Sequence, residues 1–251
     1  MQKEFILLNN QIMQKDKNTG FYQLEKDKEA VAEYMNYVLN NFLPELKVID
    51  SYYKRLKYLC ENGYYTKDLL DGYTEDEIKT IADKVYSYDF KFESYMAISK
   101  FYQSYALKTD DKKHYLELYE DRIIVCALFL AKYTNHKNQS TSLFDDAYDY
   151  AVSMIEQRYQ PATPTFLNSG RARSGELVSC FLLEADDSLN SIYYNISTCA
   201  QLSKAGGGVA VSLSKLRSRN EPIKGIEGAA SGVIPVMKLM EDTFGYVNQL
   251  G

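Results

Sequence analysis

Apolar side chains recur at helical spacing through the first 160 residues. In the stretch DKEAVAEYMNYVLNNFL, residues 27–43, they fall on one face of a 3.6-residue period. Similar patterns predict helices over 74–86, 94–107, 121–134 and 142–159. Thr74 and Ser142 precede two of these stretches as candidate caps, since a short side-chain oxygen accepts from the free N–H groups of a first turn. The stretch over 121–134 is apolar enough to be a central core helix, with Cys126 as a small buried side chain.

The pattern changes after Pro161. QPATPTFLNSG, residues 160–170, breaks the helical spacing, and short β-like runs then alternate with helical ones. Strands are predicted over 177–185 and 207–214, and helices over 187–206 and 232–247. This alternation predicts parallel strands in an α/β layer. Because two parallel strands do not make a stable sheet alone, we expect the chain to be the front part of a larger protein.

Composition and charge exclude several classes of protein. The chain has 251 residues, 45% of them hydrophobic, and a net charge of −5, without the basic surface of a duplex-binding protein. No segment has the roughly 18 to 20 apolar residues that a membrane span needs, and the N-terminus lacks a cleavable signal, so the cytosol is the expected compartment. The four cysteines stand far apart, and His114 and His136 lie in polar, Lys-rich surroundings, so neither a zinc site nor a small disulfide scaffold is predicted.

GELVSCFLLEADDSL, residues 175–189, carries the first candidate chemistry. Cys180 within the strand is read most simply as buried packing. Function in parallel α/β folds gathers at the C-terminal ends of strands, however, and because this strand ends a few residues later a ligand could reach the thiol. Asp186, Asp187 and Ser188 suit a helix cap, or they engage a metal, hydroxyls or the ribose of a nucleotide. Both questions stay open at this point.

Two further segments could serve a nucleotide. In KAGGGVAVS one glycine is needed to stop the helix, and three in a row suggest that something approaches the backbone, although a bare turn is the simpler reading. KLRSRNEPIKG is a solvated surface loop or a source of phosphate contacts through Arg217, Arg219 and Lys224. Periodicity does not say which nucleotide would bind.

Several long motifs of this sequence resemble those of a known family. The run from QPATPTFLNSG to EADDSLNSI, then LSKAGGGVAVSLSKLR, PIKGIEGAASGVIPVMKLMED and NQLG, strongly resembles the large, catalytic subunit of class I ribonucleotide reductase, particularly the class Ib type. Upstream, FKFESYMAISKFYQSYALKT and YLELYEDR resemble the helical N-terminal region of the same subunit. The match covers most of the chain from about residue 60 onward.

The resemblance implies a fold and an activity. The family reduces ribonucleoside diphosphates to deoxyribonucleotides by radical chemistry inside a ten-stranded α/β barrel. The expected fold class is α plus α/β, a helical N-terminal region followed by the first βα units of that barrel. The implied domains are a helical domain over 1–85 without a full ATP cone, a helical domain over 86–160, and the start of the barrel over 161–251. Without such a cone, weak or absent inhibition by dATP is expected.

The resemblance also implies roles for individual residues. Cys180 matches one half of the redox-active dithiol that is left as a disulfide in each turnover. Thr163 and Ser179 match substrate-binding positions, and Gly208 matches a backbone contact to substrate.

A second implied site binds an allosteric effector, a deoxynucleoside triphosphate or ATP, at a dimer interface. The matching positions are Asp187, Ser188, Leu189, Arg217 and Lys224. Lys224 stands where some relatives have Arg, so a bidentate phosphate contact is lost there while the charge remains.

Cofactors and partners follow from the same resemblance. No cofactor is expected in this chain: the radical comes from a small subunit with a dimanganese or diiron centre, and magnesium accompanies the effector. The expected partners are that small subunit, a thioredoxin- or glutaredoxin-like reductant and a second copy of the complete subunit, with no membrane or nucleic acid. The radical cysteine, the partner of Cys180 and the C-terminal shuttle cysteines would lie beyond Gly251. The alternatives are a non-catalytic nucleotide-binding or subunit-assembly module and an unstable fragment with exposed strand edges.

Overall fold

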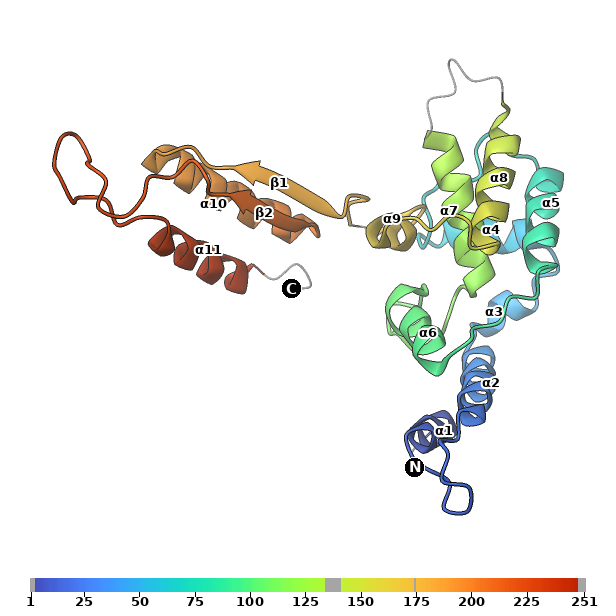
Figure 1. The fold of residues 1–251 in the computed structure, drawn as a ribbon. Helices are drawn as coiled ribbons and strands as arrows, with labels where there is room; N and C mark the ends of the chain where they lie inside the picture. Colours follow the sequence, from blue (N-terminus) through green and yellow to red (C-terminus); the bar gives the residue numbers. More distant parts are fainter. Residues whose placement is uncertain (1–2, 134–140, 174, 248–251) are drawn as a thin grey trace. The chain divides into compact units, whose positions relative to one another are not determined.

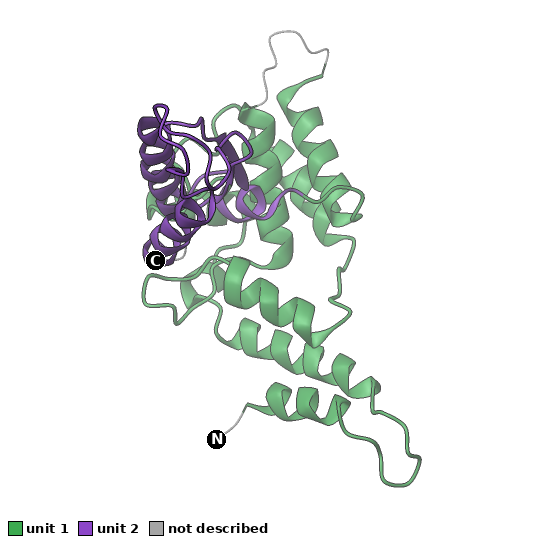
Figure 2. Ribbon diagram, turned by 60° about the vertical axis from the view of Figure 1, so that its left-hand side comes forward, with its two compact units in different colours: residues 1–160, 169–173 green, residues 161–168, 174–251 purple. Residues whose placement is uncertain are grey.

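The computed structural model describes residues 3–133, 141–173 and 175–247 (Figure 1). The chain divides into two compact units, coloured separately in Figure 2. Unit 1 comprises Met1–Gln160 with Ser169–Arg173, and unit 2 comprises Pro161–Asn168 with Ser174–Gly251. Each unit is described by itself. His136 lies outside the described residues.

Unit 1 is built from helices. They are α1 (Glu4–Ile12), α2 (Glu25–Asn40), α3 (Pro44–Lys47), α4 (Tyr52–Glu61), α5 (Glu75–Tyr86), α6 (Tyr95–Lys100), the π-helix η1 (Phe101–Tyr105), α7 (Tyr119–Tyr133) and α8 (Leu143–Ile155). The predicted helical region is thus confirmed, and the structure adds α1, α3 and α4. The predicted single helix over 94–107 is instead α6 continued by η1.

The core of unit 1 forms around α7. Every residue from Ile123 to Leu128 is buried, including Cys126, so the predicted central core helix is confirmed. α7 packs against α8, and α5 packs against both. Thr74 and Ser142 cap α5 and α8 through capping boxes, in which each hydroxyl accepts from the backbone three residues on.

A buried ionic cluster joins three segments of unit 1 that are distant in the sequence. Glu117 is fully buried, and its carboxylate accepts from the Tyr65 hydroxyl at 2.7 Å, the Leu107 N–H at 2.9 Å and Arg171 Nη2 at 2.6 Å. The fully buried Arg122 lies 3.6 Å from the same carboxylate. Burial by itself would raise the pKa of Glu117, but the two guanidiniums outweigh it and lower that pKa.

Unit 2 contains one βαβ unit with flanking helices. Its elements are α9 (Thr163–Asn168), β1 (Cys180–Glu184), α10 (Leu189–Ala205), β2 (Gly208–Ser212) and α11 (Ile234–Tyr246). β1 and β2 are parallel and α10 connects them, as the alternating pattern predicts. α9 is an addition, because the spacing over 160–170 predicts only a break.

Candidate functional site

The two strands of unit 2 leave one face of their sheet open. Phe181, Leu183, Val209 and Val211 are half-buried, and since α10 contacts both strands we assign this face to α10. Side chains alternate between faces along a strand, so the other face carries the exposed residues. These are Cys180, Leu182, Glu184, Gly208, Ala210 and Ser212.

Cys180 stands at the start of β1. The predicted strand over 177–185 places the thiol in the middle of the strand, a few residues before its C-terminal end. In the structure β1 begins at Cys180, so the thiol lies at the N-terminal end of the strand. The reading of Cys180 as buried packing is also wrong, because the residue is exposed. The open sheet face, and not the C-terminal end of the strand, makes this thiol accessible.

Ser179 and Gly208 lie directly beside the thiol. Gly208 is the register partner of Cys180, and its N–H donates to the Ser179 carbonyl at 2.9 Å. Glycine stands at the three consecutive positions 206–208 for different structural reasons. Gly206 ends α10 with a φ of +106°, and a Cβ on Gly207 would lie 2.1 Å from the Phe181 ring. A Cβ on Gly208 would meet only ordinary contacts, so the bare backbone there leaves open surface next to Cys180.

Thr163 belongs to a helix that adjoins the same strand. It is the exposed first residue of α9. Thr165 Oγ1 donates to the Leu177 carbonyl at 2.8 Å, and Asn168 Nδ2 donates to the Glu176 carbonyl at 2.9 Å. These bonds hold α9 against the chain segment that leads into β1.

Cys180 differs from the other three cysteines. Cys60, Cys126 and Cys199 are buried, and burial raises the pKa of each thiol, that of Cys60 to about 11. Cys180 is therefore the exposed thiol of the chain and the one suited to redox exchange. In the described part of the chain, no three His, Cys, Asp or Glu side chains are grouped as metal ligands.

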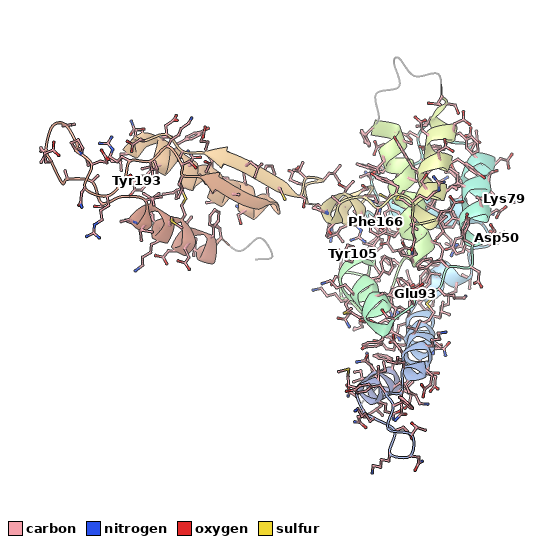
Figure 3. All side chains as sticks on the ribbon, viewed as in Figure 1. Asp50, Lys79, Glu93, Tyr105, Phe166 and Tyr193 are labelled. Atoms are coloured by element: carbon pink, nitrogen blue, oxygen red, sulfur yellow. The ribbon has the colours of Figure 1, made fainter. Side chains whose placement is uncertain are left out.

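The acidic turn lies at the opposite end of β1 from Cys180. Ser188 caps α10, and its Oγ accepts from the Ser191 N–H at 3.2 Å, so the predicted cap is confirmed. The N–H of Asp186 donates to Ser191 Oγ at 2.9 Å, which fixes the turn. Leu189 begins the helix and is 70% exposed, and Tyr193, one turn further along α10, is also exposed (Figure 3).

Cations from the loop after β2 pair with this turn. Arg217 Nε lies 2.7 Å from Asp187 Oδ2, and Arg217 Nη1 donates to the Pro222 carbonyl at 3.1 Å. Lys215 Nζ lies 2.6 Å from Glu184 and 3.2 Å from Asp186. The sequence reasoning missed Lys215, although it stands two residues before Arg217 in the same basic loop.

The predicted effector-site residues come from the acidic turn and the loop after β2. Asp187 pairs with Arg217, and Ser188 and Leu189 follow Asp187 in the chain. Lys224 lies in a tight turn with a φ of +51°, closed by a hydrogen bond from Ile226 N–H to the Ile223 carbonyl, two residues after Pro222, whose carbonyl accepts from Arg217. No ion pair links Lys224 to any residue that the structure describes.

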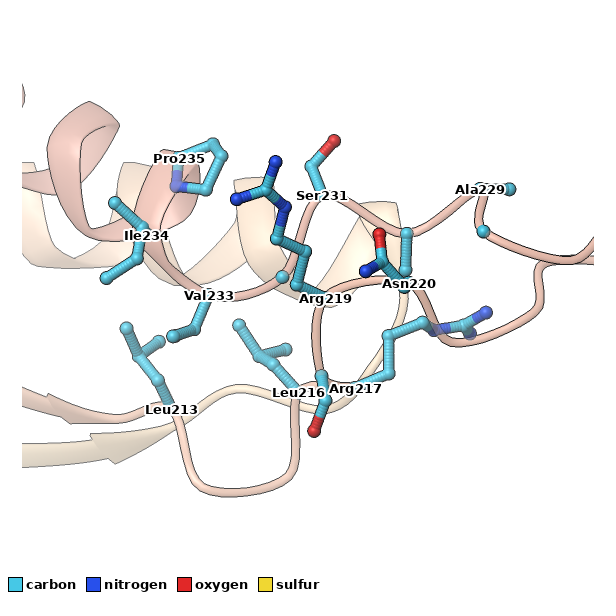
Figure 4. Close-up of a pocket in the computed structure, with 14 residues that line it drawn as sticks. Leu213, Leu216, Arg217, Arg219, Asn220, Ala229, Ser231, Val233, Ile234 and Pro235 are labelled. Carbon is cyan, nitrogen blue, oxygen red and sulfur yellow. The ribbon is translucent and has the colours of Figure 1, made fainter.

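A pocket of about 770 Å³ adjoins this loop (Figure 4). Its lining comes from two segments of unit 2, residues 213–220 and 228–235. It includes Arg217 and Arg219 together with a set of apolar side chains, Leu213, Leu216, Val233, Ile234 and Pro235. The pocket therefore combines positive charge with an apolar wall.

Three family models match consecutive parts of the chain. The model described as ribonucleotide reductase N-terminal matches residues 5–90, the all-alpha domain matches 91–174, and the barrel domain matches 178–251. No helix among the described residues is long and apolar enough to cross a membrane.

Similar proteins carry matching names. A ribonucleoside-diphosphate reductase subunit alpha of Bacillus subtilis (strain 168) is 49% identical over 252 residues, which cover 99% of this chain and 33% of the relative. The NrdEB subunit alpha from the same strain is 49% identical over 255 residues, 98% of this chain and 22% of the relative. The subunit alpha of Mycoplasma genitalium is 45% identical over 225 residues, which cover 90% of this chain and 30% of the relative. The chain thus spans between 22% and 33% of these relatives' lengths, and it belongs to the ribonucleotide reductase large-subunit family.

Proposed function

We propose that this chain is the N-terminal part of a ribonucleoside-diphosphate reductase alpha subunit of the class Ib type, working in the cytoplasm on deoxyribonucleotide synthesis for DNA. The three matching family models and the names of the relatives support the family. The observation that carries the chemistry is the exposed Cys180 beside Gly208 on the open sheet face. In the proposed whole protein, this face of the sheet points to the inside of a ten-stranded barrel. The proposed domains are 1–85, 86–160 and 161–251.

Cys180 supplies one thiol of the electron-donating pair. Reduction of the substrate replaces the 2′ hydroxyl of the ribose by hydrogen and releases one water molecule. The two electrons come from two thiols, which leave the reaction joined as a disulfide. An external dithiol of the thioredoxin or glutaredoxin type reduces this disulfide by exchange. The second thiol of the pair lies in the remainder of the proposed protein.

The neighbours of Cys180 suit substrate binding. Exposed Ser179 and Thr163 offer hydroxyls for a diphosphate, and Gly208 offers a backbone approach without a Cβ. A radical-generating small subunit with a dimanganese or diiron centre starts the reaction.

The acidic turn and the basic loop form the proposed effector site. Asp187, Ser188 and Leu189 meet the sugar and base of a deoxynucleoside triphosphate or ATP, and Arg217 and Lys224 supply positive charge for its phosphates. A magnesium ion is bound through the nucleotide. In a homodimer of complete subunits, the exposed surface of α10 is the proposed contact beside this site.

The test joins this chain to the remaining part of the Bacillus subtilis alpha subunit, which is 49% identical over the shared region. With the small subunit, CDP and thioredoxin, the joined protein is expected to make dCDP over many turnovers. Cys180→Ser is expected to abolish thioredoxin-dependent turnover, whereas Cys199→Ala, at a buried cysteine of the same unit, should retain it. Unimpaired multiple turnover by Cys180→Ser would reject the assignment.

A non-catalytic nucleotide-binding or subunit-assembly module is the second candidate. The pairing of Arg217 with Asp187 beside a pocket favours it, because this arrangement exists within the chain alone. Calorimetry with dTTP or dATP on the 251-residue chain tests it: specific binding that is lost in Arg217→Ala, together with no reductase activity of the joined protein, favours the module.

A further inference from the structure

A short segment of unit 1 interrupts unit 2 in the sequence. Residues 169–173, which we call the strap, belong to unit 1, whereas 161–168 and 174–251 belong to unit 2. The helix α9 precedes the strap, and the segment that leads into β1 follows it. The strap therefore connects the helix that begins with Thr163 to the strand that begins with Cys180.

Hydrogen bonds hold the backbone of the strap in unit 1. The Ser169 carbonyl accepts from Arg122, and both residues are fully buried. Two further bonds run from the Thr66 N–H to the Gly170 carbonyl at 2.9 Å and from the Ala172 N–H to the Tyr64 carbonyl at 3.1 Å. Gly170 has a φ of +74°, and a Cβ there would lie 2.8 Å from Val125 Cγ1 in α7. The strap thus lies in direct contact with the core of unit 1.

Arg171 holds the middle of the strap through its side chain. Its Nη2 donates to Glu117 Oε1 at 2.6 Å and also to the Tyr105 carbonyl. The Arg171 side chain is 11% exposed and Glu117 is fully buried, so water competes little for this ion pair. A charge-assisted hydrogen bond from a planar guanidinium is strong and directional. The side chain therefore keeps the strap in one conformation.

The two flanks of the strap meet each other within unit 2. Asn168, the last residue of α9, donates from Nδ2 to the Glu176 carbonyl, and a Cβ on Gly175 would lie 3.3 Å from the same nitrogen. Thr165 binds the Leu177 carbonyl in the same way. The strap is thus the middle of a short closed loop. Its conformation decides how far apart the end of α9 and the start of the lead-in to β1 lie.

We propose that Arg171 is a positioning residue for the thiol site. By holding the strap, it places α9 against the lead-in to β1 and so sets the positions of Thr163 and Ser179 around Cys180. The inference rests on the proposed function, which gives these hydroxyls a substrate diphosphate to bind. Arg171 acts through the strap and not on the substrate. A misplacement of about 1 Å at a reacting site can cost about a hundredfold in rate, so a loose strap should weaken the reaction.

Two independent changes to the strap test the proposal in the protein joined to the Bacillus subtilis remainder. Arg171→Met removes the ion pair but leaves Arg122 beside Glu117, and Gly170→Ala displaces the backbone but keeps the ionic cluster. Each should raise the KM for CDP about tenfold or more, with a smaller fall in kcat, because the substrate hydroxyls move first. Arg171→Lys, which keeps the charge beside Glu117, should recover most of the affinity.

The matched control destabilises unit 1 without touching the strap. Tyr86→Phe removes the 2.6 Å hydrogen bond to the buried Asp121 carboxylate. It should leave the KM for CDP within about twofold, since independent sites do not couple. All variants are compared at a temperature at which far-UV circular dichroism shows them folded.

Hydrogen exchange on the 251-residue chain supplies a measurement that needs no turnover. The amides of residues 163–168 and 176–180 should exchange about tenfold faster in both strap variants and at the wild-type rate in Tyr86→Phe. If the joined protein has no reductase activity, the proposed function fails while this exchange still decides whether the strap orders α9 and the lead-in to β1. Unchanged exchange, faster exchange with an unchanged KM, or an equal rise in KM in Tyr86→Phe would each overturn the positioning role.

Discussion

Replacing Glu117 by glutamine should destabilise unit 1 severely. The substitution keeps the shape of the side chain but removes the negative charge between the guanidiniums of Arg122 and Arg171. Glu117 and Arg122 are fully buried, and the Arg171 side chain is only 11% exposed, so water cannot replace the lost charge. Removing one partner of a buried ion pair costs about 3–5 kcal/mol. A domain has roughly 5–15 kcal/mol of stability in total, so Glu117→Gln should remove about a fifth of it or more.

Urea unfolding at pH 7, followed by the near-ultraviolet circular dichroism of tyrosine, measures this loss. Most of the 23 tyrosines lie in unit 1, so the signal reports mainly on that unit. Glu93→Gln serves as the control, because Glu93 is exposed and has no ion pair among the described residues (Figure 3). Its effect should stay within about 0.5 kcal/mol. Combining Glu117→Gln with Arg171→Met should cost less than the sum of the two single substitutions, because the second removes one of the charges left unpaired.

The stability difference between wild type and Glu117→Gln should also depend on pH in a definite direction. The folded-state pKa of Glu117 is lowered, so its contribution is fully present above the ordinary value of 4.5 and is lost as the pH falls through the lowered pKa. The difference between wild type and Glu117→Gln should therefore shrink in acid. A difference below about 1 kcal/mol at neutral pH, or one that grows in acid, would refute the argument that this ion pair stabilises the fold.

Three further outcomes are expected. Thr74→Ala should lower the stability of unit 1 by about 1 kcal/mol in the same urea assay, because the capping box of α5 is lost, and an unchanged midpoint would contradict the role of the cap. In the native chain one thiol should react rapidly with an aromatic disulfide reagent and three slowly, with the rapid reaction absent in Cys180→Ser; a rapid phase that survives this substitution would show that a buried cysteine is accessible. Gly232→Ala should distort the loop next to Arg219 and increase its proteolysis, since alanine at φ +77° is strained and its Cβ would press on the Arg219 backbone; wild-type resistance to protease would argue against that geometry.

The local elements were largely predictable from the sequence. Helical spacing located the main helices of unit 1, and a hydroxyl before an acidic first turn located the caps at Thr74 and Ser142. The cap at Ser188 was located by the short polar run Asp186 to Ser188 at the predicted start of the helix. α4 was missed, although Ser51 caps it and Leu56 and Leu59 lie on its buried face. Its signal was present in the sequence but short, at ten residues.

The remaining features depend on contacts between distant residues. The thiol was placed in mid-strand because the apolar run starts at residue 177, but β2 begins only at Gly208, so residues before Cys180 have no strand to pair with. The local pattern also hides the role of Arg171, which belongs to the Glu117 cluster more than 50 residues earlier in the chain. Lys215 and Arg219 are cations of the same loop, and the sequence does not show that Lys215 pairs with Glu184 whereas Arg219 has no ion pair among the residues that the structure describes.

The glycine turn between α10 and β2 determines which side chains of β2 point to each face of the sheet. Gly206 ends the helix, and Gly208, two residues later, pairs with Cys180, so the length of this turn decides which residue faces the thiol. Strand side chains alternate, so a shift of β2 by one residue would turn Val209 toward the open face and place it beside Cys180. Shortening the turn by a single residue would therefore exchange the open backbone next to the thiol for a branched side chain, whereas lengthening it by two would preserve the face and move only the position along the strand.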